Sequence, residues 1–232
     1  MRTLLALTIA IAALCTWLLH SGRLAVPPEW NPWAPLSVHH PPNLLTRHKL
    51  LRLEQDAPQC QAVLDRAGLK HTTLPDNDLR DGCGWRDAVR VDDARFHPAF
   101  TLTCPAAVSL ALWERHGLQA AASTHLGGRV IQVEHVGSYA CRNVRGDTGG
   151  EGSRRSQHAT ANAFDVIGFR LADGRRVSVL DHWPREGTRE ARFLRDARNG
   201  ACPFFSATLS PDYNAAHRDH LHLDRGSFRM CR

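Results

Sequence analysis

The chain has 232 residues, of which 43% are hydrophobic and 22% are charged, a composition that is ordinary for a globular protein. This length allows one full-sized hydrophobic core and is short for two, so we expect one folded domain. The formal net charge of +6 suits an anionic partner such as phospholipid headgroups or a cell-wall polymer, but we interpret it first as a solubilising surface. We expect no nucleic-acid partner.

The first twenty residues form an apolar segment. Arg2 precedes an uncharged run over residues 3–19, which is about as long as the shortest membrane-spanning helices (~17 residues) and longer than most signal-peptide cores (~7–15 residues). No A-x-A cleavage site follows, and the large Leu14 before Cys15 argues against a lipoprotein attachment site. We predict that residues 1–20 are an N-terminal transmembrane anchor, with a cleaved signal peptide as the alternative. The folded part is then expected in the periplasm of the cell envelope, anchored in the inner membrane or, after cleavage, secreted.

Residues 21–43 contain six prolines and show neither helical nor strand periodicity. Proline fixes φ and removes a hydrogen-bond donor, so this composition predicts an extended, fairly stiff tether. Trp30 and Trp33 either lie at a membrane interface, where amphipathic rings are favourable, or pack back onto the following domain. The folded domain is expected over residues 44–232.

Helices are expected early in this domain and strands later. Apolar residues at helical spacing predict helices, with Pro105 in a first turn and Gly68 as a stop signal. Because the strands are mostly joined by loops, we predict an α+β fold in which a small antiparallel sheet is flanked by helices. The expected helices are 58–69, 103–118 and 188–200, the expected strands are 129–136, 161–171 and 175–183, and the expected mobile, glycine-rich loop is 142–155.

Six cysteines follow the apolar segment, and none forms a C-x-x-C pair. An even number without such pairs favours disulfides over a thiolate metal site and supports export to an oxidising compartment. The sequence does not choose among the possible pairings. The cysteines are Cys60, Cys83, Cys104, Cys141, Cys202 and Cys231.

Two segments combine histidine with aspartate. The first, HRDHLHLD over residues 217–224, places His220 and His222 on one face if it forms a strand. The second, SQHATANAFD, holds His158 and Asp165, and this carboxylate lies in an apolar run where burial without a partner would be costly. One histidine of the first segment would complete two imidazoles and one carboxylate, which suits a catalytic zinc site with an open fourth position. The alternatives are that Asp165 pairs with an arginine, and that both segments are polar clusters without a metal.

The two segments together resemble known signatures. SQHATANAFD (156–165) resembles the S-x-H-x-x-G-x-A-x-D signature of the zinc peptidases of the lysostaphin and D-Ala-D-Ala peptidase superfamily, and DHLH (219–222) resembles its H-x-H signature. With GSYACR (137–142), FRLADGRRVSVLDHW and ACPFF, most of residues 44–232 resembles the bacterial extensin-like C-terminal domain family. One departure is Ala161, where the peptidase signature has glycine.

This resemblance implies a site in which His158, Asp165 and His222 hold Zn2+. It implies that His220 lies beside the water on the metal and assists proton transfer, whereas Asp219 takes the place of an acidic general base found in other members. Both candidates for the base stay open, with His220 preferred because aspartate is shorter than the usual glutamate.

The resemblance also implies substrate contacts. Tyr139 and Arg142 match a G-Y-R-like segment that binds substrate, and Ser156 corresponds to the serine of the signature. Arg142 could pair bidentately with a substrate carboxylate. His217 and Asp219 could instead orient the ligating imidazoles.

A peptidase of this kind would hydrolyse amide bonds in peptidoglycan stem peptides or cross-links, with zinc activating water and polarising the scissile carbonyl. The alternative is a catalytically inactive zinc-containing domain that binds cell-wall polymers or an envelope protein. The observation that separates these functions is whether Asp219 and His220 point at the open position of the metal. The sequence does not determine the oligomeric state.

Overall fold

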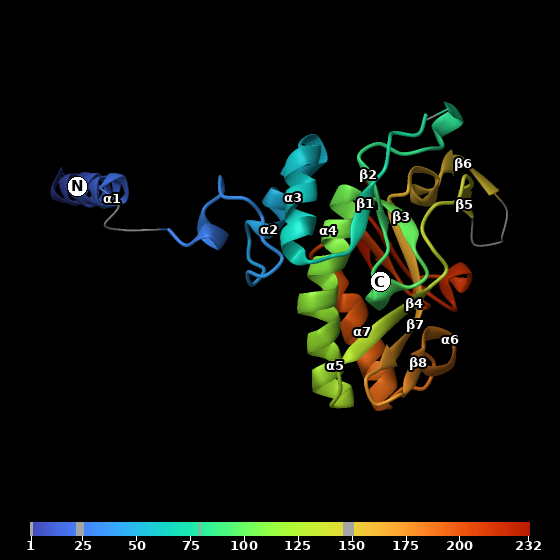
Figure 1. The fold of residues 1–232 in the computed structure, drawn as a ribbon. Coiled ribbons are helices and arrows are strands. Elements are labelled where there is room, and N and C mark those ends of the chain that lie inside the picture. Colours follow the sequence, from blue (N-terminus) through green and yellow to red (C-terminus); the bar gives the residue numbers. More distant parts are fainter. Residues whose placement is uncertain (1, 22–25, 79, 146–150) are drawn as a thin grey trace.

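Several β-sheets and a group of helices make up an α+β fold (Figure 1). The computed structural model describes residues 2–21, 26–78, 80–145 and 151–232. Within these ranges there is a three-stranded, a six-stranded and a two-stranded sheet. The α+β class is therefore confirmed. The expectation of one small antiparallel sheet was wrong, because strand pairing is spread over several sheets and includes one parallel pair, between β9 and β11.

The six-stranded sheet is built around β7 (Ala163–Leu171), a strand of nine residues. β7 pairs antiparallel with β10 (Leu221–Asp224) on one side and with β4 (Val130–His135) on the other. β8 (Arg176–Ser178) pairs with the C-terminal half of β7, and β9 (Ala207–Leu209) lies outside β10. The sheet therefore places the two histidine-containing segments side by side. The remaining edge strand is β11 (Met230–Cys231).

The helices pack against this sheet through aromatic side chains. The ring of Phe169 on β7 lies 6.2 Å from that of Trp113 and 5.1 Å from that of Phe193, measured between centroids. Trp113 also donates from Nε1 to the carbonyl of Ala197 at 2.8 Å. The hydrophobic core thus lies between the sheet and the helices (Figure 1). These helical segments are α4 (Cys104–Leu112), a π-helical turn (Trp113–Leu118), α5 (Gln119–Leu126) and α7 (Arg189–Ala201).

The smaller elements lie around this core. The three-stranded sheet has the order β1, β2, β3 and is antiparallel. β5 and β6 pair with each other within the predicted mobile loop, whose centre, 146–150, lies outside the described residues. The elements are α2 (Thr46–Arg52), α3 (Ala57–Ala67), β1 (His71–Thr73), β2 (Ala88–Val91), β3 (Phe100–Thr103), β5 (Asn143–Arg145), β6 (Glu151–Arg155) and α6 (Val179–His182).

Most of the predicted helices and strands are confirmed in type and place. α3 ends at Gly68, which adopts φ +66° as its left-handed cap, and Thr188 caps the start of α7. The strand predicted over 175–183 is confirmed in its first part, which is β8, and wrong in its second part, which is helical. Ser178 accepts a hydrogen bond from the backbone N–H of Asp181, and this cap ends β8 and starts α6.

Helix α1 (Arg2–His20) forms, but the prediction that it spans a membrane was wrong. Among the residues that the structure describes, no helix combines the length and the apolar content needed to cross a membrane. α1 has 19 residues.

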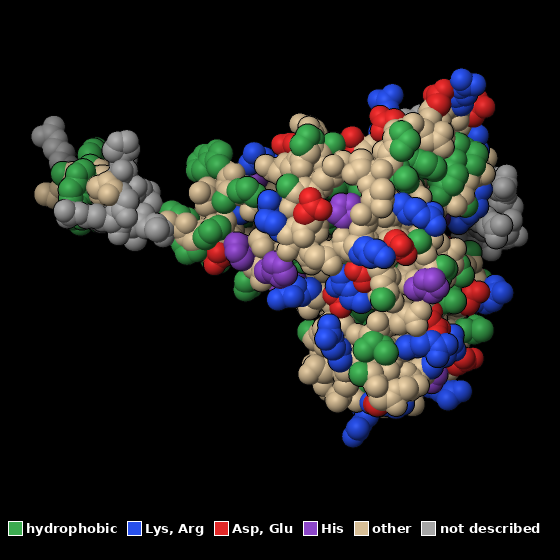
Figure 2. Space-filling view, in the orientation of Figure 1, with side chains coloured by type: hydrophobic (Ala, Val, Ile, Leu, Met, Phe, Trp, Pro, Cys, Tyr) green, Lys and Arg blue, Asp and Glu red, His purple; other side chains and the backbone are tan. Residues whose placement is uncertain are grey.

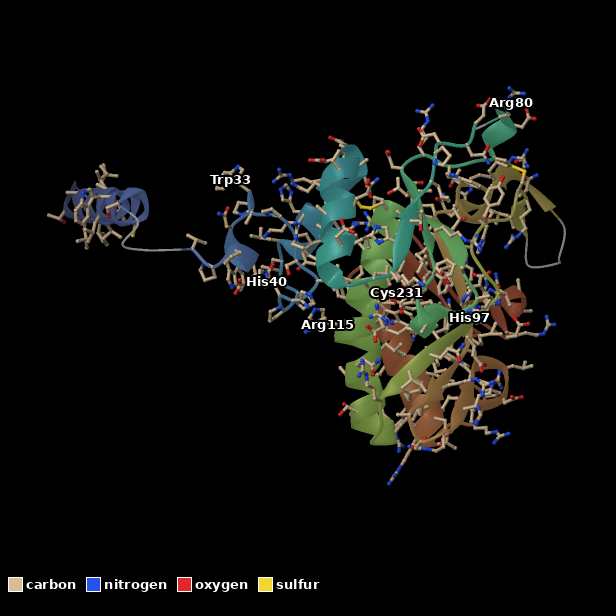
Figure 3. The ribbon with its side chains drawn as sticks, viewed as in Figure 1. Trp33, His40, Arg80, His97, Arg115 and Cys231 are labelled. Carbon is tan, nitrogen blue, oxygen red and sulfur yellow. A yellow bond between two sulfur atoms is a disulfide. The ribbon has the colours of Figure 1, made fainter. Side chains whose placement is uncertain are left out.

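The described part of the proline-rich segment lies against the domain. Leu36 and Val38 are only 5% and 4% exposed and belong to the hydrophobic core. Nζ of Lys49 on α2 donates to the carbonyl of Pro28 at 2.7 Å. Trp33, by contrast, is 80% exposed and points away from the chain (Figure 3). The packed core therefore begins before the predicted start of the domain.

Three disulfides join segments that are distant in the sequence, and the prediction of a disulfide-stabilised fold is confirmed. Cys60–Cys104 links α3 to α4, and Cys202–Cys231 links the end of α7 to β11. Cys83–Cys141 holds the segment after β4 to the loop before β2. That segment carries two of the predicted site residues, so this disulfide supports the site.

Basic and acidic side chains are interspersed on the face that Figure 2 shows. Mixed charges of this kind keep a surface soluble without concentrating a field of one sign. The dispersal agrees with the interpretation of the net charge as a solubilising surface.

Helix α7 lies close to the π-helical turn at Gly200, and this contact predicts whether a larger residue there raises or lowers the free energy of unfolding. Helix propensity alone predicts that Gly200→Ala stabilises the protein by ~1 kcal/mol. A Cβ at Gly200 would, however, lie 2.7 Å from Cα of Gly117, so we expect a net loss of ~1–3 kcal/mol in the free energy of unfolding. Urea denaturation measures this change in the free energy of unfolding. Asn199→Ala, on the exposed side of the same helix, is the control and should be neutral or stabilising; a stabilised Gly200→Ala protein would contradict the packing.

Candidate metal centre

Asp165 and His222 face each other across neighbouring strands. β7 and β10 run antiparallel, and their register pairs Asp165 with His222. Leu221 and Leu223 on β10 are fully buried in the core, and His222 and Asp224 alternate with them. Because side chains alternate across a strand, His222 and its cross-strand partner Asp165 share the face opposite the two leucines.

His158 comes from the turn that leads into β7. Ser156 accepts a hydrogen bond at Oγ from the backbone N–H of His158 at 3.3 Å, and so caps the 3-10 helix Gln157–Thr160. This helix ends at Ala161, which has φ +51°, a left-handed conformation that costs a non-glycine residue ~1–2 kcal/mol. The peptidase signature has glycine at this position, and the backbone conformation gives a physical reason for that preference.

Three buried side chains meet at one point. Nε2 of His158 lies 3.1 Å from Oδ2 of Asp165 and 3.2 Å from Nδ1 of His222, and this Nδ1 lies 2.9 Å from Oδ1 of Asp165. Ligand atoms placed ~2.0–2.2 Å from a tetrahedral zinc are about 3.3 Å apart, so the spacing fits one shared ion. His158, Asp165 and His222 can therefore hold a metal ion.

The outer nitrogen of each imidazole is held by an oxygen. Nδ1 of His158 donates to the backbone carbonyl of Ser138 at 2.6 Å, and Nε2 of His222 donates to Oδ2 of Asp224 at 3.0 Å. These acceptors fix the ring orientations and leave the inner nitrogens to face the shared point. Sequence reasoning missed both partners. Asp224 could have been found, because it follows His222 by two positions on a strand, whereas a backbone carbonyl has no side-chain signal.

The electrostatics of this cluster favour a positive charge beside Asp165. Burial lowers the pKa of His222, but the hydrogen bonds and charges of Asp165 and Asp224 outweigh burial and raise it to about 9. Burial likewise opposes the charge of Asp165, yet hydrogen bonds from His158 and His222 hold its pKa well below the usual range. Near neutral pH a proton therefore lies between His222 and Asp165, and a metal ion would displace it.

His220 lies beside this cluster, and Asp219 lies behind His220. Nε2 of His220 is 3.8 Å from Oδ1 of Asp165, and its Nδ1 donates to Oδ1 of Asp219 at 2.9 Å. This hydrogen bond lowers the pKa of Asp219. Of the two candidate bases, His220 thus faces the cluster, and Asp219 contacts it only through His220.

The ring of His217 packs on two other histidine rings without a side-chain hydrogen bond to them. Its ring centroid lies 5.1 Å from that of His220 and 5.8 Å from that of His222. Its Nδ1 is hydrogen bonded instead to Asn214, at 2.6 Å. Burial, and then the charges of His222 and His220, lower the pKa of His217 to about 4, so the ring is neutral. Within the described residues it makes no hydrogen bond that would orient a ligating imidazole.

A pocket of about 520 Å³ opens beside the cluster. Predicted site residues that line it are Arg142, Ser156, His217, His220 and His222. Two further arginines and several apolar and aromatic side chains complete the wall, so the pocket offers both cationic and apolar contacts. These additional residues include Arg154, Arg155, Leu209, Tyr213 and Phe228.

Tyr139 is placed differently from the other predicted substrate contacts. Its ring is 40% exposed and packs edge to face on Trp85, with 4.9 Å between centroids. In the part of the chain that the structure describes, Tyr139 is not among the residues that line the pocket. The structure therefore brings Arg142 and Ser156 to the pocket, and leaves Tyr139 beside it.

Comparison with known proteins shows a family but no annotated relative. No curated protein and no solved structure matches the chain. The likeness to zinc peptidases stays a prediction. A family model described as "Extensin-like protein C-terminus" matches residues 58–232, which confirms the second resemblance seen in the sequence, and the chain belongs to this extensin-like C-terminal family.

Proposed function

We propose that this chain is an exported zinc-dependent peptidase that hydrolyses amide bonds in the stem peptides or cross-links of peptidoglycan. The observation that carries this proposal is the meeting of His158, Asp165 and His222 at ion spacing beside a pocket of about 520 Å³. Two imidazoles and one carboxylate are a known ligand set for catalytic zinc. Three disulfides agree with export to an oxidising compartment.

His158 through Nε2, His222 through Nδ1 and the carboxylate of Asp165 would hold the zinc. When bound, zinc supplies a Lewis acid that lowers the pKa of water to about 7 and polarises a carbonyl. Ser138 and Asp224 keep the two ligating rings in their tautomers.

His220 is the general base in this mechanism. A carboxylate only accepts hydrogen bonds, so Nδ1 of His220 donates to Asp219, and Nε2 of the neutral ring carries a lone pair. That atom lies on the side of Asp165. It can take a proton from the attacking water and return it to the leaving amine. Asp219 acts through His220, by holding its tautomer and stabilising the imidazolium that forms.

The basic side chains of the pocket suit an acidic peptide. Arg142 and Arg154 line the pocket, and the one side-chain hydrogen bond of Arg142 within the described residues, 3.3 Å long, runs from Nη1 to the carbonyl of Asn143. Its other N–H groups can pair with a substrate carboxylate. Stem peptides carry such carboxylates. A zinc-containing domain without turnover would need the same ligands, but it would give no role to the Asp219 and His220 pair. The position of this pair beside the cluster therefore favours hydrolysis.

Zinc content and turnover test the proposal directly. The full chain, folded under oxidising conditions without a histidine tag, should hold about one zinc per chain. It should release peptides from purified peptidoglycan, and a chelator should abolish release until zinc is restored. Zinc without release would favour the binding domain. A chain without zinc would mean that the histidine segments are polar clusters.

Variants at Asp219 and His220 test which residue is the base. His220→Ala should keep its zinc and lose turnover by about 10²–10⁴-fold. Asp219→Asn retains an acceptor for Nδ1 but removes the charge that stabilises the imidazolium, so its turnover should fall, though less than that of His220→Ala. Peptide release and metal content are measured on the same preparations. His48→Ala changes an exposed histidine of α2 and serves as the control. A His220→Ala protein that keeps its turnover, beside an Asp219→Asn protein that loses it, would instead assign the base to Asp219.

Asp224 should tune zinc affinity although it is not a ligand. Its Oδ2 accepts from His222, and its Oδ1 accepts from the backbone N–H of Gly226 at 2.8 Å. Asp224→Asn keeps only one acceptor, so one of these donors loses its partner, and zinc affinity should fall by about 10- to 100-fold. Competition with a chromogenic chelator measures this affinity. Asp173→Asn, an exposed aspartate in the turn before β8, is the control, and unchanged affinity in Asp224→Asn would contradict the assignment.

A further inference from the structure

His217 is the pocket histidine that the proposed mechanism leaves unused. It lines the pocket together with His220 and His222. Its ring is held between the ring of Tyr213, with 5.5 Å between centroids, and that of His220, at 5.1 Å. The imidazole is thus fixed in place on the pocket wall.

Asn214 sets the tautomer of this ring. Oδ1 of Asn214 accepts a hydrogen bond from the backbone N–H of Ala216 at 3.1 Å, which identifies this atom as the oxygen of the amide. The same Oδ1 lies 2.6 Å from Nδ1 of His217. Because this oxygen only accepts, Nδ1 must donate, and Nε2 is left with a lone pair. No residue within the described ranges forms a hydrogen bond with this Nε2.

We propose that His217 binds substrate directly, by accepting at Nε2 a hydrogen bond from the N–H of the leaving group. This inference rests on the proposed function, which supplies the leaving amine. To return a proton, His220 must reach the leaving nitrogen, and His217 packs on His220 at the same wall. The N–H of that nitrogen would otherwise enter the pocket without a partner, which is costly for a desolvated donor.

The consequence is a preference for amide over ester linkages. An ester oxygen has no hydrogen to donate, and it would set its lone pairs against the lone pair of Nε2. A site built around a substrate N–H discriminates strongly against the analogue that lacks it, because its own polar group is then unpaired. His217 is therefore assigned to specificity and His220 to proton transfer.

A matched pair of zinc-binding inhibitors tests the inference. The probes are a phosphonamidate analogue of acyl-D-alanyl-D-alanine, which has an N–H at the leaving position, and the corresponding phosphonate, which has an oxygen there. The zinc-loaded full chain should bind the phosphonamidate about 10- to 100-fold more tightly. Calorimetric titration of each probe gives this ratio.

Variants then assign the preference to His217. His217→Leu should bind both probes with equal affinity while keeping its zinc content, since His217 is not a ligand. His217→Gln, whose amide oxygen can accept, should keep part of the ratio. Asn214→Asp preserves the acceptor and should keep the full ratio, whereas Asn214→Leu should lower it. The ¹⁵N shifts of His217 in the zinc-loaded chain should show a protonated Nδ1 and an unprotonated Nε2.

The outcomes separate this inference from the proposed function. Equal affinity for both probes in the unmodified chain, an unchanged ratio in His217→Leu, or a protonated Nε2 would overturn the role of His217 and leave the peptidase proposal in place. If neither probe binds the zinc-loaded chain, the proposed function fails and the inference fails with it.

Discussion

The carboxylate of Asp165 is the constraint on which the site depends. It is buried on β7 and keeps its negative charge because two imidazoles point at it. An ionised carboxylate in such a place is stable only with a positive partner. The raised pKa of His222 makes its protonated ring such a partner near neutral pH, and a metal ion would take the place of that proton. The arrangement therefore favours the folded state most when a cation is present.

The rest of the fold serves to bring the parts of this cluster together. The register of β7 and β10 sets Asp165 against His222, and the Ser156 cap and the left-handed turn at Ala161 direct His158 toward them. A register shift of one residue would turn His222 into the core and Leu221 toward Asp165 and His158. The helices behind the sheet hold this register by packing on Phe169.

Local patterns predicted much of this structure, and tertiary contacts account for what they missed. Spacing indicated His158 and Asp165 as candidate ligands, and strand alternation placed His220 and His222 on one face, whereas the choice of His222 as the third candidate ligand came from the family resemblance. Helical spacing with Gly68 as a stop signal predicted α3, and the end predicted for α7 at Gly200 lies one residue before the observed end at Ala201. The choice between Asp219 and His220, the disulfide pairing and the burial of Leu36 and Val38 depend on segments distant in the sequence. The membrane prediction failed because an uncharged run alone does not make a helix long and apolar enough. Alternation along β10 would have indicated Asp224.

The same hydrogen-bonding arrangement recurs at four histidines: His158 in the buried cluster, and His217, His220 and His222 on the pocket wall. Each ring has one nitrogen held by an oxygen that only accepts: a backbone carbonyl for His158, the Asn214 amide for His217, and carboxylates for His220 and His222. Once the proton between His222 and Asp165 is displaced, the other nitrogen of each neutral ring presents a lone pair. Such a wall repels acceptors and attracts cations and N–H donors. In the proposed mechanism a metal ion would satisfy two of the rings, a transferred proton would satisfy His220, and a substrate N–H would be the donor for His217.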